Sequence, residues 1–423
     1  MAGGTGAWTR RGILAGGAAV LASAGLPLAF AGEPPDPVSP VDRPRLWGRI
    51  ANPSHLGERP VSALFFAGPP NPNSLPLYTR HPLWPDRQDW SGPSDVRFVL
   101  SRFASPGLNT IKLSYFGHDG ETDQWSPSWL FSRQRWSGDG TGFYTEAEQV
   151  VRGRELFRIA AERNLLVAPM LEVSPAFRFW AEFPTNLKGL VGRAAWLLRN
   201  FGDAPNYLRI FDKDGRPRHV VWLIESIHVG PVDPIEFAAG FDRAADLLYD
   251  ELGYRVGLVV DPSPLPAYGT HAGPEPAALR EAASILAVNP FNITSQGPGE
   301  PKPQDQITEA ERLAYARSIM ARWAGSGIPF IAPVIPGYDA HVVFPGSGVY
   351  GFNPAWRRAQ RELALEFGSG GLSVDTWNGF TEGYAIPPTE EDGDVHLTWI
   401  RSTVAALRRR WATSDGLSGR TVA

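Results

Sequence analysis

The 423-residue sequence contains no cysteine. This absence excludes disulfide bonds, thiolate metal sites and a cysteine nucleophile. A strong net charge is also missing, because 40 Lys and Arg residues face 44 Asp and Glu residues, for a formal net charge of -4. No run of Lys or Arg is long enough to follow a phosphate backbone, so we expect no nucleic-acid partner.

The motifs of several enzyme classes are missing as well. The histidines show neither H-E-x-x-H nor H-x-H spacing, so we expect neither a metal ion nor a cofactor. The Gly-Ser-Gly-Gly stretch at residues 368–371 lacks the lysine of a P-loop, and no G-x-S-x-G elbow is present. A serine hydrolase is therefore disfavoured.

The N-terminus has the features of a targeting segment. Arg10 and Arg11 precede an uncharged stretch rich in Ala, Gly and Leu, which ends in Ala29-Phe30-Ala31, an A-x-A cleavage pattern. The pattern predicts a twin-arginine signal peptide over residues 1–31 and export, to the cell envelope or the medium. An uncleaved N-terminal anchor is the alternative. No later segment is long and apolar enough to span a bilayer, so we expect no stable membrane insertion after the signal is removed.

The rest of the chain divides into a linker, one domain and a tail. Residues 32–50 are rich in proline and predict a linker without a core. An apolar content of 43% is ample for a packed core, and we expect one domain over residues 51–415. Residues 416–423 are predicted to be a disordered tail.

Short apolar runs alternate with longer helical patterns, which is typical of βα units in a parallel sheet. Eight runs predict strands: 61–66, 109–115, 165–172, 220–225, 255–261, 284–289, 328–335 and 371–377. Helical spacing is clearest in four segments between them: 146–164, 233–253, 308–327 and 353–370. Eight strands with intervening helices predict a single (β/α)8 TIM barrel with long aromatic-rich βα loops. A doubly wound open sheet is the competing architecture.

A TIM barrel has its active site at the C-terminal ends of its strands. In this sequence, carboxylate and amide side chains occur at or shortly after the ends of the predicted strands: Glu172, Glu225, Asp261, Asn289, Asp339, Asn378 and Glu382. Glu172 and Glu225 each end an apolar run, where a carboxylate would be desolvated unless it faced a polar cavity. Asp261 precedes Pro-Ser-Pro and is equally well explained as a loop residue.

Two predicted loops are rich in aromatic residues among Gly, Ser and Asp. The loop after the second strand carries Trp125, Trp129 and Trp136, and the loop after the first carries Tyr78, His81, Trp84 and Trp90. Such rings suit the apolar C–H faces of sugars, and we expect the three tryptophans of the second loop to bind substrate. Alternatively, these aromatic rings only anchor the long loops to the top of the barrel.

Two stretches near the C-terminus resemble a known family. "WNGFTEG" at residues 377–383 follows the eighth predicted strand, and "APVIPGYDAH" at residues 332–341 covers the end of the seventh. Together they resemble the endo-α-mannosidase and endo-α-mannanase family of glycoside hydrolases and, more distantly, the fungal α-1,3-glucanase family. The resemblance implies that Glu382 is the general acid/base. The other carboxylate of the family motif falls on Gly379, so a second catalytic carboxylate must come from another strand, with Glu225 and Glu172 first and Asp339 third.

The sequence therefore predicts an exported glycoside hydrolase that acts on a polysaccharide, an oligosaccharide or a cell-envelope glycan. Its chemistry requires one protonated carboxyl and one ionised carboxylate. Besides the tryptophans, the residues expected to contact substrate are Tyr338, Asp339, Trp377, Asn378 and Tyr384. A catalytically inactive glycan-binding barrel and a lyase on the same barrel remain alternatives.

Overall fold

The computed structural model divides the chain into two units, Met1–Ser39 and Pro40–Ala423. All residues that the structure describes lie in the second unit: 43–66, 78–83, 93–115, 134–135, 142–143, 146–172, 183–224, 234–263, 275–291, 293–295, 303–342 and 345–418. The predicted signal peptide lies outside them. Within the described residues no helix combines the length and apolar character needed to cross a bilayer.

Eight parallel strands form the barrel, in the order β10-β13-β1-β2-β5-β7-β8-β9. A parallel bridge between Val288 and Phe330 joins the two ends of this row, and Val288 N donates to Pro329 O at 2.9 Å. The ring is thereby closed, which confirms the predicted barrel over an open sheet. The strands are β1 Val61–Phe65, β2 Thr110–Tyr115, β5 Leu166–Glu172, β7 Pro217–Ile224, β8 Val256–Val260, β9 Ile285–Val288, β10 Ile331–Val334 and β13 Gly371–Val374.

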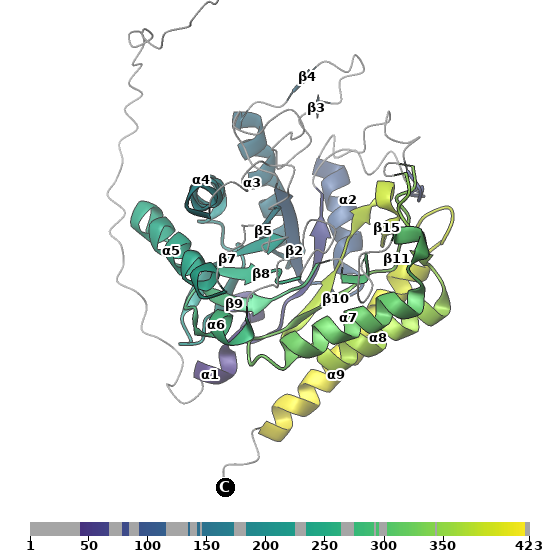
Figure 1. The fold of residues 1–423 in the computed structure, drawn as a ribbon. Helices are drawn as coiled ribbons and strands as arrows, with labels where there is room; N and C mark the ends of the chain where they lie inside the picture. The colour runs from purple at the N-terminus through teal and green to yellow at the C-terminus, as the bar shows by residue number, and fades with distance from the viewer. Residues whose placement is uncertain are drawn as a thin grey trace, which may run out of the picture. The chain divides into compact units, whose positions relative to one another are not determined.

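A helix follows each barrel strand and lies outside the ring (Figure 1). In chain order these are α2 Pro93–Ala104, α3 Glu146–Glu162, α4 Phe183–Phe201, α5 Pro234–Leu252, α6 Pro276–Glu281, α7 Glu309–Ala324, α8 Pro354–Phe367 and α9 Val395–Ser418. The four helices predicted from spacing are α3, α5, α7 and α8. Local caps define two of their starts: Thr308 and Glu311 form a capping box on α7, and Asn353 caps α8 by accepting from Trp356 N.

Short hairpins, one short strand and single-turn helices complete the described part of the fold. Three hairpins are formed by β3 Gln134–Arg135 with β4 Gly142–Phe143, β11 Gly337–Tyr338 with β12 Tyr350–Gly351, and β14 Asn378–Gly379 with β15 Tyr384–Ala385. β6 Arg209–Phe211 pairs antiparallel with the start of β7. The single-turn elements are α1 Arg43–Leu46, η1 Pro53–His55, η6 Ile293–Ser295, η7 Gln304–Gln306 and η8 Phe380–Glu382.

Alternate residues of each strand face the helices and the barrel interior. On β1, Val61, Ala63 and Phe65 belong to the apolar layer under the helices, and Leu64 belongs to the interior cluster. Phe65 meets Phe103 of α2 edge to face, at 5.9 Å between ring centroids. Because both faces of the strand are buried, the run is apolar throughout, which explains why it could be recognised as a strand.

The barrel interior also holds a buried charge. Lys112 on β2 is 1% exposed and donates to Asp375 Oδ1 at 2.9 Å, to Asn289 Oδ1 at 3.2 Å and to Ser373 Oγ. The ammonium thus joins β2 to residues at the ends of β9 and β13. Because an unpaired buried charge is very costly, these contacts hold the three strands in one arrangement.

The barrel unit begins earlier and its last helix ends later than predicted. Trp47 Nε1 donates to Ile285 O at 3.2 Å, Gly48 N donates to Phe211 O at 3.0 Å, and Ile50 is fully buried. The last residues of the predicted linker therefore belong to the barrel. Helix α9 continues to Ser418, beyond the predicted domain end at residue 415.

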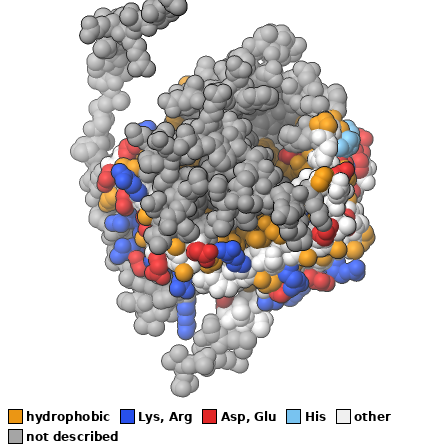
Figure 2. All heavy atoms as spheres, in the orientation of Figure 1, with side chains coloured by type: hydrophobic (Ala, Val, Ile, Leu, Met, Phe, Trp, Pro, Cys, Tyr) orange, Lys and Arg blue, Asp and Glu red, His pale blue; other side chains and the backbone are white. Residues whose placement is uncertain are grey.

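One ion-pair cluster joins these two ends of the barrel unit. Asp415 on α9 accepts from Arg49 at 2.9 Å and from Arg59 at 2.9 Å, and these arginines lower the pKa of Asp415 to about 2. Elsewhere on the surface, acidic and basic side chains are interspersed over the described part of the face in Figure 2.

We predict that Asp415→Asn lowers the free energy of unfolding by about 1 kcal/mol at neutral pH, a value reduced for solvent screening because the side chain is half exposed. A carboxyl whose pKa is depressed by folding stabilises the protein above its unfolded pKa, and that stability is lost as the pH falls toward about 2. Urea unfolding of both proteins at several pH values measures the difference. Asp250→Asn, exposed on α5, is the control and should change little. An equal difference at all pH values would contradict the assignment.

Candidate active site

Glu382 lies on the loop that follows β13, at the rim where the C-terminal ends of the barrel strands meet. It is the last residue of η8 and is followed by Gly383, whose φ of 73° is left-handed. A Cβ at Gly383 would lie 3.0 Å from Asp339 Cβ, so only glycine fits both the turn and the contact. Asp339 N donates to Glu382 O at 2.9 Å, which fixes this loop to the one after β10.

Two tyrosines hold the carboxyl group of Glu382. Tyr338 Oη donates to Oε1 at 3.2 Å, and Tyr384 Oη donates to Oε2. The two rings are stacked, with centroids 5.5 Å apart and planes inclined by 14°. The predicted site residues Glu382, Tyr338 and Tyr384 are therefore brought together in one group.

Burial raises the pKa of Glu382, and the hydrogen bonds from Tyr384 and Tyr338 act in the opposite direction. The desolvation of the charged form is the larger effect. The result is a half-buried carboxyl that keeps its proton to a higher pH than an ordinary glutamate. Such a group can donate a proton to a leaving group.

Gly379 leaves no room for a side chain. A Cβ at this position would lie 2.6 Å from Thr376 Oγ1 and 2.6 Å from Cε2 of Tyr384. Thr376 Oγ1 also accepts from Gly379 N at 2.8 Å. At the sequence position where the resembled family carries a carboxylate, the ring of Tyr384 and the hydroxyl of Thr376 thus exclude any side chain.

Trp377 and Asn378 make contacts within the protein. Trp377 is fully buried, and its ring lies 5.0 Å from that of Phe103 on α2. Asn378 Nδ2 donates to Phe66 O at 2.8 Å, and its Oδ1 accepts from Phe66 N at 3.0 Å. Both residues therefore tie the loop after β13 to the barrel and to the end of β1.

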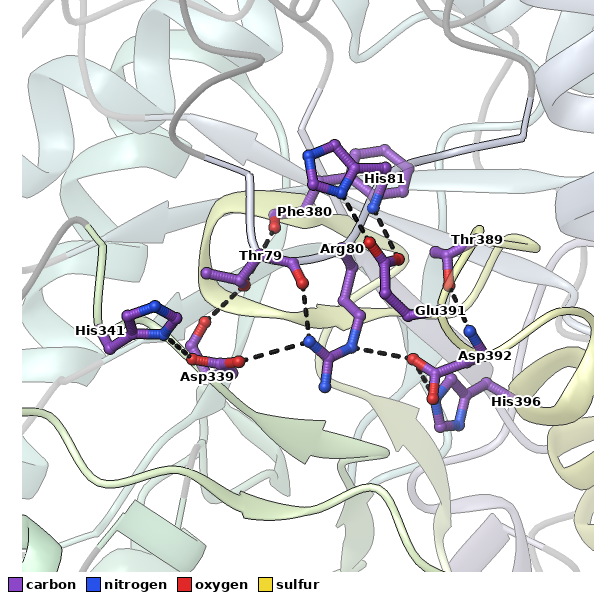
Figure 3. A network of polar contacts seen from close by, with 10 residues as sticks. All are labelled: Thr79, Arg80, His81, Asp339, His341, Phe380, Thr389, Glu391, Asp392 and His396. Carbon is purple, nitrogen blue, oxygen red and sulfur yellow. Dashed lines mark hydrogen bonds and ion pairs between the residues drawn. The ribbon is translucent and has the colours of Figure 1, made fainter.

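A network of charged residues joins three loops over the rim (Figure 3). Arg80, from the loop after β1, donates to Asp339 Oδ2 at 3.3 Å and to Asp392 Oδ2 at 2.9 Å. Its guanidinium also lies 3.8 Å from the centroid of the Phe352 ring. Arg80 therefore connects the loops after β10 and β13, which carry Tyr338 and Glu382.

Further contacts strengthen this network. Thr79 Oγ1 donates to Asp339 O at 2.6 Å, and His341 Nδ1 contacts Asp339 Oδ1. His81 Nδ1 lies 2.6 Å from Glu391 Oε1. Asp339 is 7% exposed and is surrounded by these partners, so its carboxylate serves to join the loops.

Of the remaining predicted site residues, the structure describes only the backbone position of Glu172. Glu225, Trp125, Trp129 and Trp136 lie outside the described residues, and so do Trp84 and Trp90. Glu172 is the last residue of β5, opposite Ile224 on β7. Among the residues that the structure describes, no three His, Asp or Glu side chains are grouped to hold a metal ion.

Sequence reasoning missed Arg80 as part of the site. It is separated from Asp339 and Asp392 by about 260 and 310 positions, and no motif marks it. The only local signal was its position between Tyr78 and His81 in an aromatic loop after the first strand.

Comparisons with known proteins agree with this architecture. No family model and no curated protein sequence matches the chain. Among solved structures it is similar to the GH99 endo-alpha-mannosidase from Bacteroides thetaiotaomicron in complex with BIS-TRIS-propane, with a TM-score of 0.55 and 14% identity over 84% of this chain and 98% of that one.

A second structure of that mannosidase has a TM-score of 0.53 and 13% identity, covering 83% of this chain and 98% of the other. A structure described as a glycoside hydrolase-like protein has a TM-score of 0.53 and 13% identity, covering 82% and 93%. These likenesses confirm the (β/α)8 fold. The resemblance to the fungal α-1,3-glucanase family stays a prediction.

We predict that the stability of Glu382→Gln relative to wild type increases from acid to neutral and higher pH. A carboxyl whose pKa is raised by folding contributes stability below its unfolded pKa of about 4.5, and this contribution is lost as the pH rises through its folded pKa. Glutamine does not titrate. The difference in melting temperature between variant and wild type should therefore grow with pH, and a difference that is constant or shrinks would refute the raised pKa.

We predict that Gly379→Ala destabilises the protein by about 1–3 kcal/mol, because the new methyl group must displace the ring of Tyr384. Thermal unfolding measures the loss. Gly192→Ala is the control, because this exposed glycine, like Gly379, has no positive φ and has open space around the added methyl group, so it should cost no stability. Equal losses in the two variants would show that the Tyr384 contact is unimportant.

Proposed function

We propose that the chain is an exported glycoside hydrolase that cleaves glycosidic bonds in a polysaccharide or cell-envelope glycan, with Glu382 as its general acid/base. The observation that carries this proposal is the half-buried carboxyl of Glu382, held between two tyrosyl hydroxyls at the barrel rim. Glycosidic cleavage needs a carboxyl that is still protonated near the working pH. Export is supported by the paired arginines and the A-x-A pattern of the N-terminus.

The second carboxylate comes from the opposite side of the barrel in this proposal. In the closed ring, β5 stands three places and β7 four places from β13. Glu172 ends β5, and Glu225 directly follows β7 in the sequence. A substrate lying across the barrel mouth would have Glu382 on one side and these carboxylates on the other, as hydrolysis requires. Asp339 is less suited, because Arg80 and His341 already engage its carboxylate.

Aromatic residues provide the sugar-binding surface in this proposal. Trp125, Trp129 and Trp136 belong to the long loop after β2, and the half-buried Tyr338 lies beside Glu382. The similar solved structure is titled an endo-alpha-mannosidase. α-Mannose-containing glycans are therefore the first substrates to examine.

A glycan-binding protein without catalytic activity is the second candidate. Gly379 supplies no carboxylate, and the ring of Tyr384 fills the adjacent space. If neither Glu172 nor Glu225 faces Glu382, the remaining candidate is Asp339, whose carboxylate Arg80 and His341 already engage, and such a site suffices for binding but not for hydrolysis.

The decisive experiment is a panel of α- and β-linked polysaccharides, α-mannans included, assayed for new reducing ends with purified protein. We expect Glu382→Gln to lower kcat by about 10²-fold on the cleaved glycan while leaving binding intact, because the amide has no transferable proton. Activated aryl glycosides should suffer less, since their leaving groups need little protonation.

Glu390→Gln, exposed on the same loop, is the matched control and should keep wild-type activity. Near-wild-type turnover by Glu382→Gln would reject Glu382 as the acid. Glycan binding without cleavage of any member of the panel would favour the binding protein.

A further inference from the structure

Arg312 on α7 is a buried cation near the candidate site. It is 1% exposed, and its Nη1 donates to Thr294 O and to Gln304 Oε1, both at 3.0 Å, while Nη2 donates to Gln304 O. These acceptors are all neutral. Its Nε has no hydrogen-bond partner within the described part of the chain. Burying a guanidinium that has only neutral acceptors costs free energy, so we expect a further interaction to stabilise Arg312 in this position.

The guanidinium lies at one end of a column of aromatic rings. Its Cζ is 4.0 Å from the centroid of Tyr350, a distance typical of a cation–π contact. Tyr350 stacks on Tyr338 with centroids 5.7 Å apart, and Tyr338 stacks on Tyr384. The last two rings carry the hydroxyls that bind the carboxyl of Glu382.

The column is closely enclosed. Tyr338 and Tyr350 are opposite each other on β11 and β12, and the next pair in this hairpin is Gly337 with Gly351. A Cβ at Gly351 would lie 2.5 Å from Gly337 Cα, and a Cβ at Gly348 would lie 2.9 Å from Arg312 Nη2. The rings therefore have little freedom to move apart while Arg312 is in place.

We propose that Arg312 is a positioning residue for Glu382, acting through Tyr350 on Tyr338, whose hydroxyl donates to the carboxyl group. This inference rests on the proposed role of Glu382 and extends the site to a side chain that does not itself bind the carboxyl group. The cation holds the face of Tyr350, Tyr350 holds Tyr338, and Tyr338 reaches Oε1 of Glu382. Loss of the cation should loosen Tyr338 and weaken its hydrogen bond to Glu382.

The test follows the protonation of Glu382 without any substrate. Wild-type and variant proteins are treated with a water-soluble carbodiimide and glycine ethyl ester over a range of pH, and labelling of Glu382 is quantified by peptide mapping. The hydrogen bond from Tyr338 lowers the pKa of Glu382. We therefore expect Arg312→Gln to move the labelling midpoint to higher pH by about half a unit or more.

Arg322→Gln is the matched control, because Arg322 lies on the same helix, is exposed, and also sits over a ring, at 5.7 Å from the centroid of Trp323. Its midpoint should equal that of wild type. Should Arg312→Gln not fold, Tyr350→Leu and Tyr350→Phe decide the question. Phenylalanine keeps the ring and should keep the midpoint, whereas leucine removes the ring and should shift it.

A folded Arg312→Gln protein with a wild-type midpoint would overturn the proposal and leave Arg312 as an anchor for Thr294 and Gln304. Equal midpoints for Tyr350→Leu and Tyr350→Phe would overturn it as well. On any glycan that the wild type cleaves, we expect Arg312→Gln to lower kcat about tenfold with little change in KM. If no glycan is cleaved, the hydrolase proposal fails, while the labelling result still decides the role of Arg312.

Discussion

Closure of the eight-stranded ring is the constraint on which the candidate site depends. The ring makes β10, β13 and β1 neighbours, although β1 begins the barrel and β10 and β13 end it. Because all eight strands are parallel, the loops that follow these three meet at one rim. The contacts of Arg80, Asp339 and Glu382 across those loops depend on the pairing of β13 with both β10 and β1.

At that rim, two opposing effects act on Glu382. Burial disfavours the charged carboxylate, and the hydroxyls of Tyr338 and Tyr384 favour it. A buried carboxyl without donors would stay neutral, and one with many donors would stay ionised. Burial is the larger of the two effects, so the carboxyl of Glu382 keeps its proton to a higher pH than an exposed glutamate does.

The geometry of the rim is set by close backbone contacts and buried charges. Glycines at 379 and 383 allow Tyr384 and Asp339 to approach the chain directly, and a methyl group at either position would be too close. Arg80 and Lys112 are partly or fully buried with carboxylate partners, Asp339 and Asp392 for the former and Asp375 for the latter. Removing one partner of such a pair is costly, so the loops are held in a single arrangement.

Much of the architecture was predictable from local pattern. The eight strands follow from apolar runs, because barrel strands are buried on both faces. Four of the helices follow from helical spacing and caps, because burial on one face leaves a period in the sequence. The three residues of β6 were missed, since they form a strand only by pairing with the start of β7. The start of the barrel unit was missed for a similar reason: Trp47 and Ile50 lie in a short polar context and are recognised as core only by their distant contacts.

For the site, the sequence alone determined the position of Glu382 at the end of the last strand, through its motif. Only the tertiary structure decided its surroundings: that Tyr338 and Tyr384 bind its carboxyl, that Trp377 is core, and that Arg80 joins the loops. The physical reason is the distance along the chain between the partners. A motif records neighbours in sequence, whereas stacking, hydrogen bonding and desolvation act between groups that only the closed barrel brings within a few ångströms of each other.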